Sequence, residues 1–161
     1  QLFGSGTIMY EVLKAQQILE EKYGVAADVW SVTSYKELYR NGNDCERWNM
    51  LHPGETPKVP FVTQCLKDAP GVFVAASDYM KVLPESIRQW IPRPLVALGT
   101  DGFGRSESRE ALRDFFEVDA KHIVLATLTA LLREKQIKPE VLQQAVKDLG
   151  INPEKPNPAI S

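Results

Sequence analysis

The chain has 161 residues, 43% of them hydrophobic, which is enough to build the core of one globular domain. Its formal net charge of −2 gives no electrostatic reason to expect nucleic acid or an anionic membrane as a partner. No apolar segment approaches the roughly 20 residues of a membrane-spanning helix, and Cys45 and Cys65 lack metal-type spacing, so we expect a cytoplasmic protein with reduced thiols.

Residues 1–32 predict a strand, a helix and a second strand. The first strand leads into a glycine-rich turn, Gly-Ser-Gly-Thr, at positions 4–7. Apolar residues then recur at helical spacing, and we expect Thr7 to cap this helix and Gly24 to end it. The second strand is expected at 28–32, because a crossover of this length favours a parallel, right-handed connection between the two strands.

The segment that follows predicts a short helix and then a loop. Ser34 is expected to cap a helix that runs to about Gly42. Residues 41–57 are polar and rich in turn formers, without a clear period, which indicates a functional loop or an irregular helix under a neighbouring domain. Three apolar side chains in this segment indicate a surface that something covers, namely Trp48, Met50 and Leu51.

Further elements are expected in the middle of the chain. Pro60 is suited to open a helix over 60–69, and an apolar strand follows at 72–76. Ser77 or Asp78 is expected to cap a helix that reaches Ile91 and is kinked, or starts late, at Pro84.

The most informative stretch is the apolar run at 95–98 and the turn after it. The run is typical of a buried strand, which we place in the centre of a parallel sheet. Three glycines, at 99, 102 and 104, then let the backbone turn tightly, and we expect a positive φ at Gly104. The side chains of Asp101, Phe103 and Arg105 should lie at the carboxyl edge of the sheet, where open α/β folds build their sites.

The last third of the chain is predicted to be helical. A short helix is expected at 107–116, a long and largely buried one at 119–134 capped by Asp119, and a last one at 139–149. Acids and arginines alternate along the first of these, which is typical of a solvated face and alternatively of a partner surface. The alternation of strands and helices predicts a three-layer α/β domain with a mostly parallel sheet of four or five strands.

Few residues qualify for chemistry. The turn at 4–7 is a weak candidate for binding phosphate, and tight packing of strand against helix explains its glycines better. His122 is interpreted as a core histidine. His52 has only Asp44, Cys45 and Glu46 near it in sequence, and because adjacent side chains point in different directions on a helix or a strand, these residues should not converge on a metal ion. We therefore expect no catalytic, cofactor-binding or metal-binding residue in the chain.

Several segments resemble a known family. The stretches LFGSGT near the start and GTDGFGRS at 99–106 are similar to the transketolase-like C-terminal domain of thiamin-diphosphate enzymes. Residues 32–53 (VTSYKELYRNGNDCERWNMLHP) and 77–92 (SDYMKVLPESIRQWIP) resemble the homodimeric decarboxylating components of bacterial pyruvate dehydrogenase complexes. The resemblance covers nearly the whole chain and implies an α/β/α fold with five strands, one of them antiparallel at an edge.

The resemblance also implies a function. Such enzymes decarboxylate pyruvate on thiamin diphosphate with Mg²⁺ and acetylate lipoyl groups, but their cofactor and metal ligands belong to other domains. The chain is then expected to contact the other domains and the second subunit of its homodimer, and part of it could dock on the dihydrolipoyl acetyltransferase core. We assign this interface role to the residues nearest the family's contact turns: Asp78, Tyr79, Asp101, Phe103, Gly104, Arg105 and Ser106.

The organisation of the chain agrees with such a piece of a longer enzyme. It begins in an expected strand without a polar leader, so we interpret it as one domain, residues 1–150, with a proline-rich tail at 151–161. Two alternatives stay open. One is a stand-alone α/β module that binds a small anion at the turn 4–7, and the other is the last domain of a related thiamin enzyme such as a transketolase, for which residues 35–57 are the discriminating segment.

Overall fold

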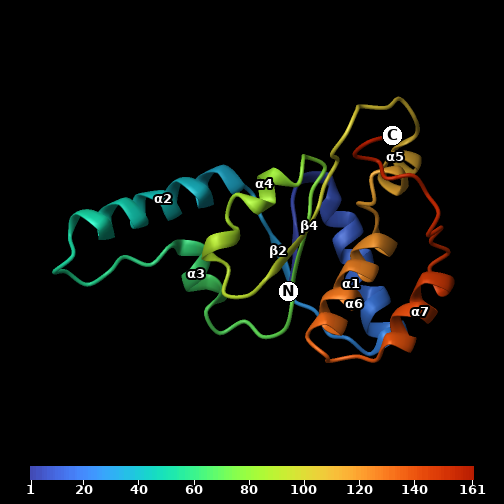
Figure 1. The fold of residues 1–161 in the computed structure, drawn as a ribbon, viewed down its shortest axis with the longest axis horizontal. Helices are drawn as coiled ribbons and strands as arrows, with labels where there is room; N and C mark the ends of the chain where they lie inside the picture. The colour runs from blue at the N-terminus through green and yellow to red at the C-terminus, as the bar shows by residue number, and fades with distance from the viewer.

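A parallel four-stranded sheet forms the centre of the computed structural model, which describes residues 1–161. The strands lie in the order β2-β1-β3-β4, and each neighbouring pair is parallel. Their bounds are β1 Leu2–Gly4, β2 Val29–Ser31, β3 Phe73–Ala76 and β4 Leu95–Leu98. Helices cover both faces (Figure 1), so the predicted three-layer α/β architecture is confirmed.

Two expectations about the sheet were wrong. The sheet has four strands and no antiparallel fifth, because every segment after β4 with enough apolar residues folds as a helix. Strand β4 lies at an edge of the sheet, and β1 and β3 are the central strands. An apolar run marks a buried strand, but β4 gains its cover from helices rather than from a strand on each side.

The first crossover follows the prediction in outline. A 3₁₀ turn, Gly6–Ile8, leads into α1, Met9–Tyr23, which ends at Gly24 as expected. Thr7 lies inside the 3₁₀ turn and does not cap the helix. Close packing explains Gly4, since a Cβ there would lie 2.5 Å from the sulfur of Met9, whereas Gly6 has a positive φ of 54°.

Helix α2, Tyr35–Leu51, is much longer than expected. Its cap is the predicted one, because Ser34 Oγ accepts a hydrogen bond from the amide of Glu37 at 3.2 Å. The helix passes through Gly42, where a Cβ would lie 2.5 Å from the ring of Trp90, so the glycine permits a close tertiary contact and does not end the helix. For residues 41–57 a loop or an irregular helix was expected, and residues 41–51 instead continue α2 as a regular helix, so the loop alternative and the helix end at Gly42 were wrong there. In Figure 1, α2 and the return segment 52–60 project from the domain as an arm.

The segment between the arm and β4 is more broken than expected. Helix α3, Phe61–Leu66, follows Pro60 as predicted. The single helix expected up to Ile91 is instead α4, Val82–Glu85, and a separate 3₁₀ turn, Arg88–Trp90. The hydroxyl of Ser77 accepts a hydrogen bond from the amide of Tyr79 at 3.1 Å, which holds the chain in a tight turn after β3 and delays the helix.

The last three helices follow the sequence pattern closely. They are α5 Arg109–Phe115, α6 Ala120–Arg133 and α7 Pro139–Asp148. Asp119 caps α6 as predicted, and Ser108 caps α5, whose start is therefore later than expected. No helix in the structure combines the length and the apolar composition that crossing a membrane would require.

The two faces of the sheet carry separate cores. On the face of α1 and α6, 18 buried residues form one cluster, most of them aliphatic. On the face of α2, α3 and α4, the cluster has 10 buried residues and contains four aromatic side chains, Phe3, Tyr35, Phe73 and Trp90. The central strands contribute side chains to both clusters, which joins the three layers into one unit.

Candidate functional site

The strand order places a topological switch point at the carboxyl ends of β1 and β3. From β1 the chain crosses to β2 on one side, and the later strands lie on the other side of β1. The loops after β1 and β3 therefore leave the sheet in different directions, and open α/β folds bind their ligands in the crevice between such loops. This edge is the first candidate site.

Hydrogen bonds connect the three loops at this edge. Ser5 Oγ and Ser77 Oγ lie 3.1 Å apart, and Thr7 Oγ1 donates to Asp78 Oδ2 at 3.4 Å. Thr100, after β4, donates from its amide to the carbonyl of Tyr79 and from its hydroxyl to the carbonyl of Asp78, both at 2.9 Å. The loops therefore form one connected surface rather than three independent ones.

A cavity of about 450 Å³ opens beside these loops. Its walls come from the strand ends on one side and from the turn 99–106 and α5 on the other. The polar and charged residues that line it are Thr7, Asp78, Thr100, Arg105, Glu107, Arg109 and Arg113. The volume lies within the roughly 300–1,000 Å³ range of small-molecule sites.

A buried glutamate fixes the helical wall of this cavity. Glu11, in α1, has a side chain that is 8% exposed and accepts a hydrogen bond from Arg113 at 2.9 Å. Its other carboxylate oxygen accepts the amide of Ala120 at 3.1 Å, at the start of α6. Sequence reasoning missed this residue, although an acid in the otherwise apolar face of the first helix was the signal that could have found it.

Exposed apolar side chains surround the same edge of the sheet. Phe103 is 80% exposed and Tyr79 is 65% exposed, and Met80 and Val82 are also largely in solvent. Asp101, by contrast, is engaged locally, since it accepts a hydrogen bond from the amide of Lys81 at 3.0 Å. We call the four apolar residues Tyr79, Met80, Val82 and Phe103 the apolar rim.

The expectation about Gly104 was wrong. Its φ is not positive, and a Cβ there would meet nothing. The strained position is Gly102, with a φ of 103°, where a Cβ would collide with the main-chain oxygen of Pro158. The sequence placed the positive φ at the wrong glycine because the partner that crowds Gly102 lies in the distant tail.

The tail, residues 151–161, packs over this turn. Lys155 Nζ donates to the carbonyl of Asp114 at 2.6 Å and pairs with Glu117 at 3.4 Å. Arg105 donates to a main-chain oxygen of Ser161 at 2.6 Å, and its guanidinium lies 4.8 Å from the centre of the Phe115 ring. Ser106, the last of the predicted interface residues, is exposed.

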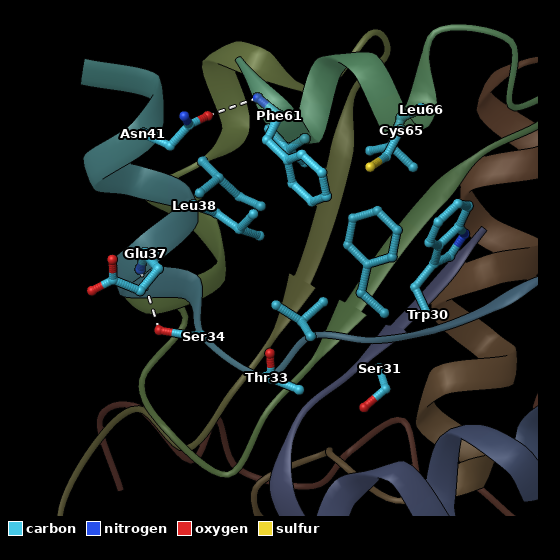
Figure 2. A pocket seen from close by; sticks show the side chains of 14 residues that line it. Trp30, Ser31, Thr33, Ser34, Glu37, Leu38, Asn41, Phe61, Cys65 and Leu66 are labelled. Carbon is cyan, nitrogen blue, oxygen red and sulfur yellow. Dashed lines mark hydrogen bonds between the residues drawn. The ribbon is translucent and has the colours of Figure 1, made fainter. Parts of the chain in front are cut away.

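A second hollow, of about 580 Å³, lies at the base of the arm and is lined by residues of β2, α2 and α3. Figure 2 shows the side chains of Trp30, Leu38 and Phe61 around it, with Cys65 at its rim. Asn41 accepts a hydrogen bond from the amide of Phe61 at 2.7 Å, which holds α3 against the arm. Nine of its 14 lining residues are hydrophobic, and among the polar ones Ser34 and Asn41 already accept hydrogen bonds from the backbone.

The histidines lie in separate places. His122 is buried as expected, and its Nδ1 lies 2.6 Å from Asp119 Oδ1. His52 stacks on Trp48 in the arm, with ring centres 4.4 Å apart, and the structure does not bring it together with Asp44, Cys45 and Glu46.

One titratable cluster was not predicted. The ligating atoms of Asp114, Asp119 and His122 lie within 4.8 Å of one another. Lys121 already contacts Asp114 at 2.5 Å, and this hydrogen bond lowers the pKa of Asp114 and raises the pKa of Lys121. The Lys121 ammonium therefore already supplies the positive charge beside these carboxylates that a bound metal ion would otherwise supply.

The chain is similar in sequence and in fold to known proteins. Residues 1–119 match the family model described as "Transketolase-like TK C-terminal domain". Proteins named "Pyruvate dehydrogenase E1 component" from Pseudomonas aeruginosa and Escherichia coli K12 are 52% and 50% identical to the chain, over 98% and 100% of its length. That of Cupriavidus necator is 48% identical over 98% of the chain. The chain spans only 18% of the length of each of these curated relatives.

A solved structure of a protein described as "Split gene transketolase, inactive beta4 tetramer" shares the fold. It superposes with a TM-score of 0.56 at 18% sequence identity, over 81% of this chain and 38% of that one. At this identity the likeness supports the arrangement of strands and helices and no functional detail.

Proposed function

The chain belongs to the transketolase-like TK C-terminal domain family, and from this membership we propose that it is the C-terminal domain of a pyruvate dehydrogenase decarboxylating component. The observation that carries the proposal is the identity of about 50% over the full chain to several proteins of that name. The whole enzyme would decarboxylate pyruvate and acetylate the lipoyl groups of a dihydrolipoyl acetyltransferase core in the cytoplasm.

Thiamin diphosphate and Mg²⁺ would serve this reaction from other domains. Mg²⁺ prefers oxygen ligands in near-octahedral geometry. The residues nearest to such a set, Asp114 and Asp119, share their cluster with His122 and are paired with Lys121. They do not suit a magnesium-diphosphate group, so no step of the reaction is assigned to residues of this chain.

The role of the chain would be to complete the assembly. The apolar rim lies at the carboxyl edge of the sheet, where Phe103 and Tyr79 expose most of their aromatic rings to solvent. Large exposed apolar side chains gathered on one surface mark an interaction site. We assign the rim, with Asp78, Asp101, Gly104, Arg105 and Ser106 beside it, to contacts with other domains and with the second subunit of a homodimer.

A domain replacement tests the proposed function. The matching 159 residues of the Pseudomonas aeruginosa relative would be replaced by this chain, and pyruvate-dependent release of CO₂ would be measured with an artificial electron acceptor. We expect activity within about tenfold of the parent, equal to that of a control carrying the Escherichia coli segment. A folded, dimeric chimera without activity, beside an active control, would contradict the proposal.

The contact role has its own test in the same chimera. Phe103→Asp places a charge in the proposed contact, where it would lose its hydration without gaining a partner. We expect the dimer to dissociate at concentrations at which the parent stays dimeric, as measured by analytical ultracentrifugation. Glu107→Asp, directly after this turn, is the control and should leave the dimer intact.

A transketolase is the weaker alternative. The solved transketolase is only 18% identical to the chain, whereas the pyruvate dehydrogenase components match it at about 50% over its full length, including residues 35–57. A chimera that used a sugar phosphate rather than pyruvate would favour this alternative.

A further inference from the structure

The cavity at the carboxyl edge has a wall of arginines whose charges are only partly neutralised. Arg109 lines the cavity and makes no ion pair. Arg105 donates to a main-chain oxygen of Ser161, the last residue of the chain, and stacks on Phe115, but no Asp or Glu side chain pairs with it. A guanidinium offers several N–H donors in a planar fork, which suits the oxygens of a phosphate or a carboxylate.

The third arginine holds this wall in place. Arg113 lies four residues after Arg109 on α5, so the two side chains share one face of the helix. Its side chain is 14% exposed, pairs with Glu11 at 2.9 Å and donates to the carbonyl of Thr7 at 3.4 Å. The charge of Arg113 is therefore used internally, and the same contacts fix the position of Arg109 opposite the strand ends.

The acids of the cavity are the main opposing charges. Glu107 accepts a hydrogen bond from the amide of Ser108 at 3.2 Å. Asp78 accepts one from the hydroxyl of Thr7 at 3.4 Å and has no cationic partner. A bound anion would be attracted by Arg105 and Arg109 and repelled by Asp78, so that its orientation is set with the oxyanion toward α5.

We propose that this cavity binds a small molecule through an oxyanion group, a phosphate or a carboxylate, held by Arg105 and Arg109. The part of the ligand that faces Asp78 would be uncharged or would carry a hydrogen-bond donor. The site is argued from the geometry of this chain. Because Asp78 and Arg105 are also assigned above to the domain contact, the cavity would lie at the border of that contact.

The test uses the 161-residue chain and two simple probes. Inorganic phosphate and acetate are titrated separately at constant ionic strength, with chloride as the compensating anion, and the backbone amide signals of Thr100, Gly102 and Arg109 are followed by NMR. We expect saturable shifts at these residues. Tighter binding of phosphate would identify a phosphate-bearing ligand, and tighter binding of acetate a carboxylate.

Three variants decide whether the binding is specific. Arg109→Gln should weaken the preferred probe roughly tenfold, because a charge-assisted hydrogen bond is lost. Asp78→Asn should tighten it severalfold, because the repulsion is removed. Arg47→Gln, which removes an exposed arginine of the arm without an ion pair, should change nothing.

The proposal would be overturned by either of two results. One is the absence of saturable shifts at the cavity with both probes. The other is an equal loss of binding in Arg109→Gln and Arg47→Gln, which would show attraction to general surface charge instead of a site.

Discussion

The two faces of the sheet differ in how many residues they bury and of what kind. The face of α1 and α6 buries a mostly aliphatic cluster and one satisfied acid, Glu11. The face of α2, α3 and α4 buries fewer residues, and four of them are aromatic. Each side has a hollow and a buried tyrosine hydroxyl without a partner: about 580 Å³ and Tyr35 on the side of α2, and about 660 Å³ and Tyr23 on the side of α1 and α6.

The same contrast appears on the surface. Most of the large apolar side chains exposed to solvent belong to the α2, α3 and α4 side: Tyr39, Met50, Leu51, Val59, Phe61, Tyr79, Met80 and Val82. We call the face of α1 and α6 the closed face and the face of α2, α3 and α4 the open face. The closed face, which buries more residues, supplies most of the stability of the domain, whereas the open face and the carboxyl edge of the sheet hold the apolar groups that another protein surface could cover. Stability and contact are therefore separated in space, and substitutions on the two sides should have different effects.

The largest effect is expected in the closed core. Leu128, in α6, is fully buried, so Leu128→Ala should lower the free energy of unfolding by about 3 kcal/mol through lost burial and a residual cavity. Phe61→Ala on the open face is the comparison, and its cost should stay below about 1 kcal/mol because more than half of this side chain is exposed. Urea denaturation measures both, and equal costs would remove the distinction between the faces.

The buried ion pair should come next. Glu11→Gln leaves Arg113 without a counter-charge in a site where both side chains are mostly buried, and we expect a loss of about 2 kcal/mol. Glu37→Gln, which breaks the exposed pair with Arg40, should cost less than about 0.5 kcal/mol. If the two variants melted at the same temperature, the Glu11 contacts would not fix α5 and α6.

A smaller loss is expected in the turn at 99–106. Gly102→Ala should cost about 1–2 kcal/mol, because its φ of 103° disfavours a side chain and the tail oxygen of Pro158 blocks a Cβ. Gly104→Ala should be neutral, since its Cβ would meet nothing. Thermal unfolding of the two variants side by side measures both losses. A larger loss of stability in Gly104→Ala than in Gly102→Ala would contradict the assignment of backbone strain to Gly102.

The smallest effect is a gain on the open face. Tyr35→Phe removes a buried hydroxyl without a partner and should stabilise the chain by about 1 kcal/mol. Burial raises the pKa of Tyr35, so the folded state keeps this proton at pH values where the unfolded state loses it, and stability falls as pH rises above about 10. Between pH 9 and 11 the free energy of unfolding should therefore fall less in the variant than in the parent, as measured by urea denaturation. An unchanged alkaline profile would contradict the assignment.

The sequence predicted the closed face better than the open one. Helix α6 and its cap Asp119 follow from local periodicity and capping, which need no knowledge of distant residues. Helix α2 was cut short at Gly42, because the reason for that glycine is the ring of Trp90, nearly fifty residues away. The positive φ of Gly102 and the cavity contacts of Glu11 were missed for the same cause, since each depends on a partner far along the chain.

The central claim is that the apolar rim at the carboxyl edge contacts other parts of a longer protein. Hydrogen exchange of the isolated chain, compared with the same chain inside the Pseudomonas aeruginosa chimera, tests it most directly. We predict strong additional protection in the chimera at residues 77–82 and 99–106, and little change in α1 and α6, which are already packed. Protection confined to α7 or absent from both rim segments would contradict the account.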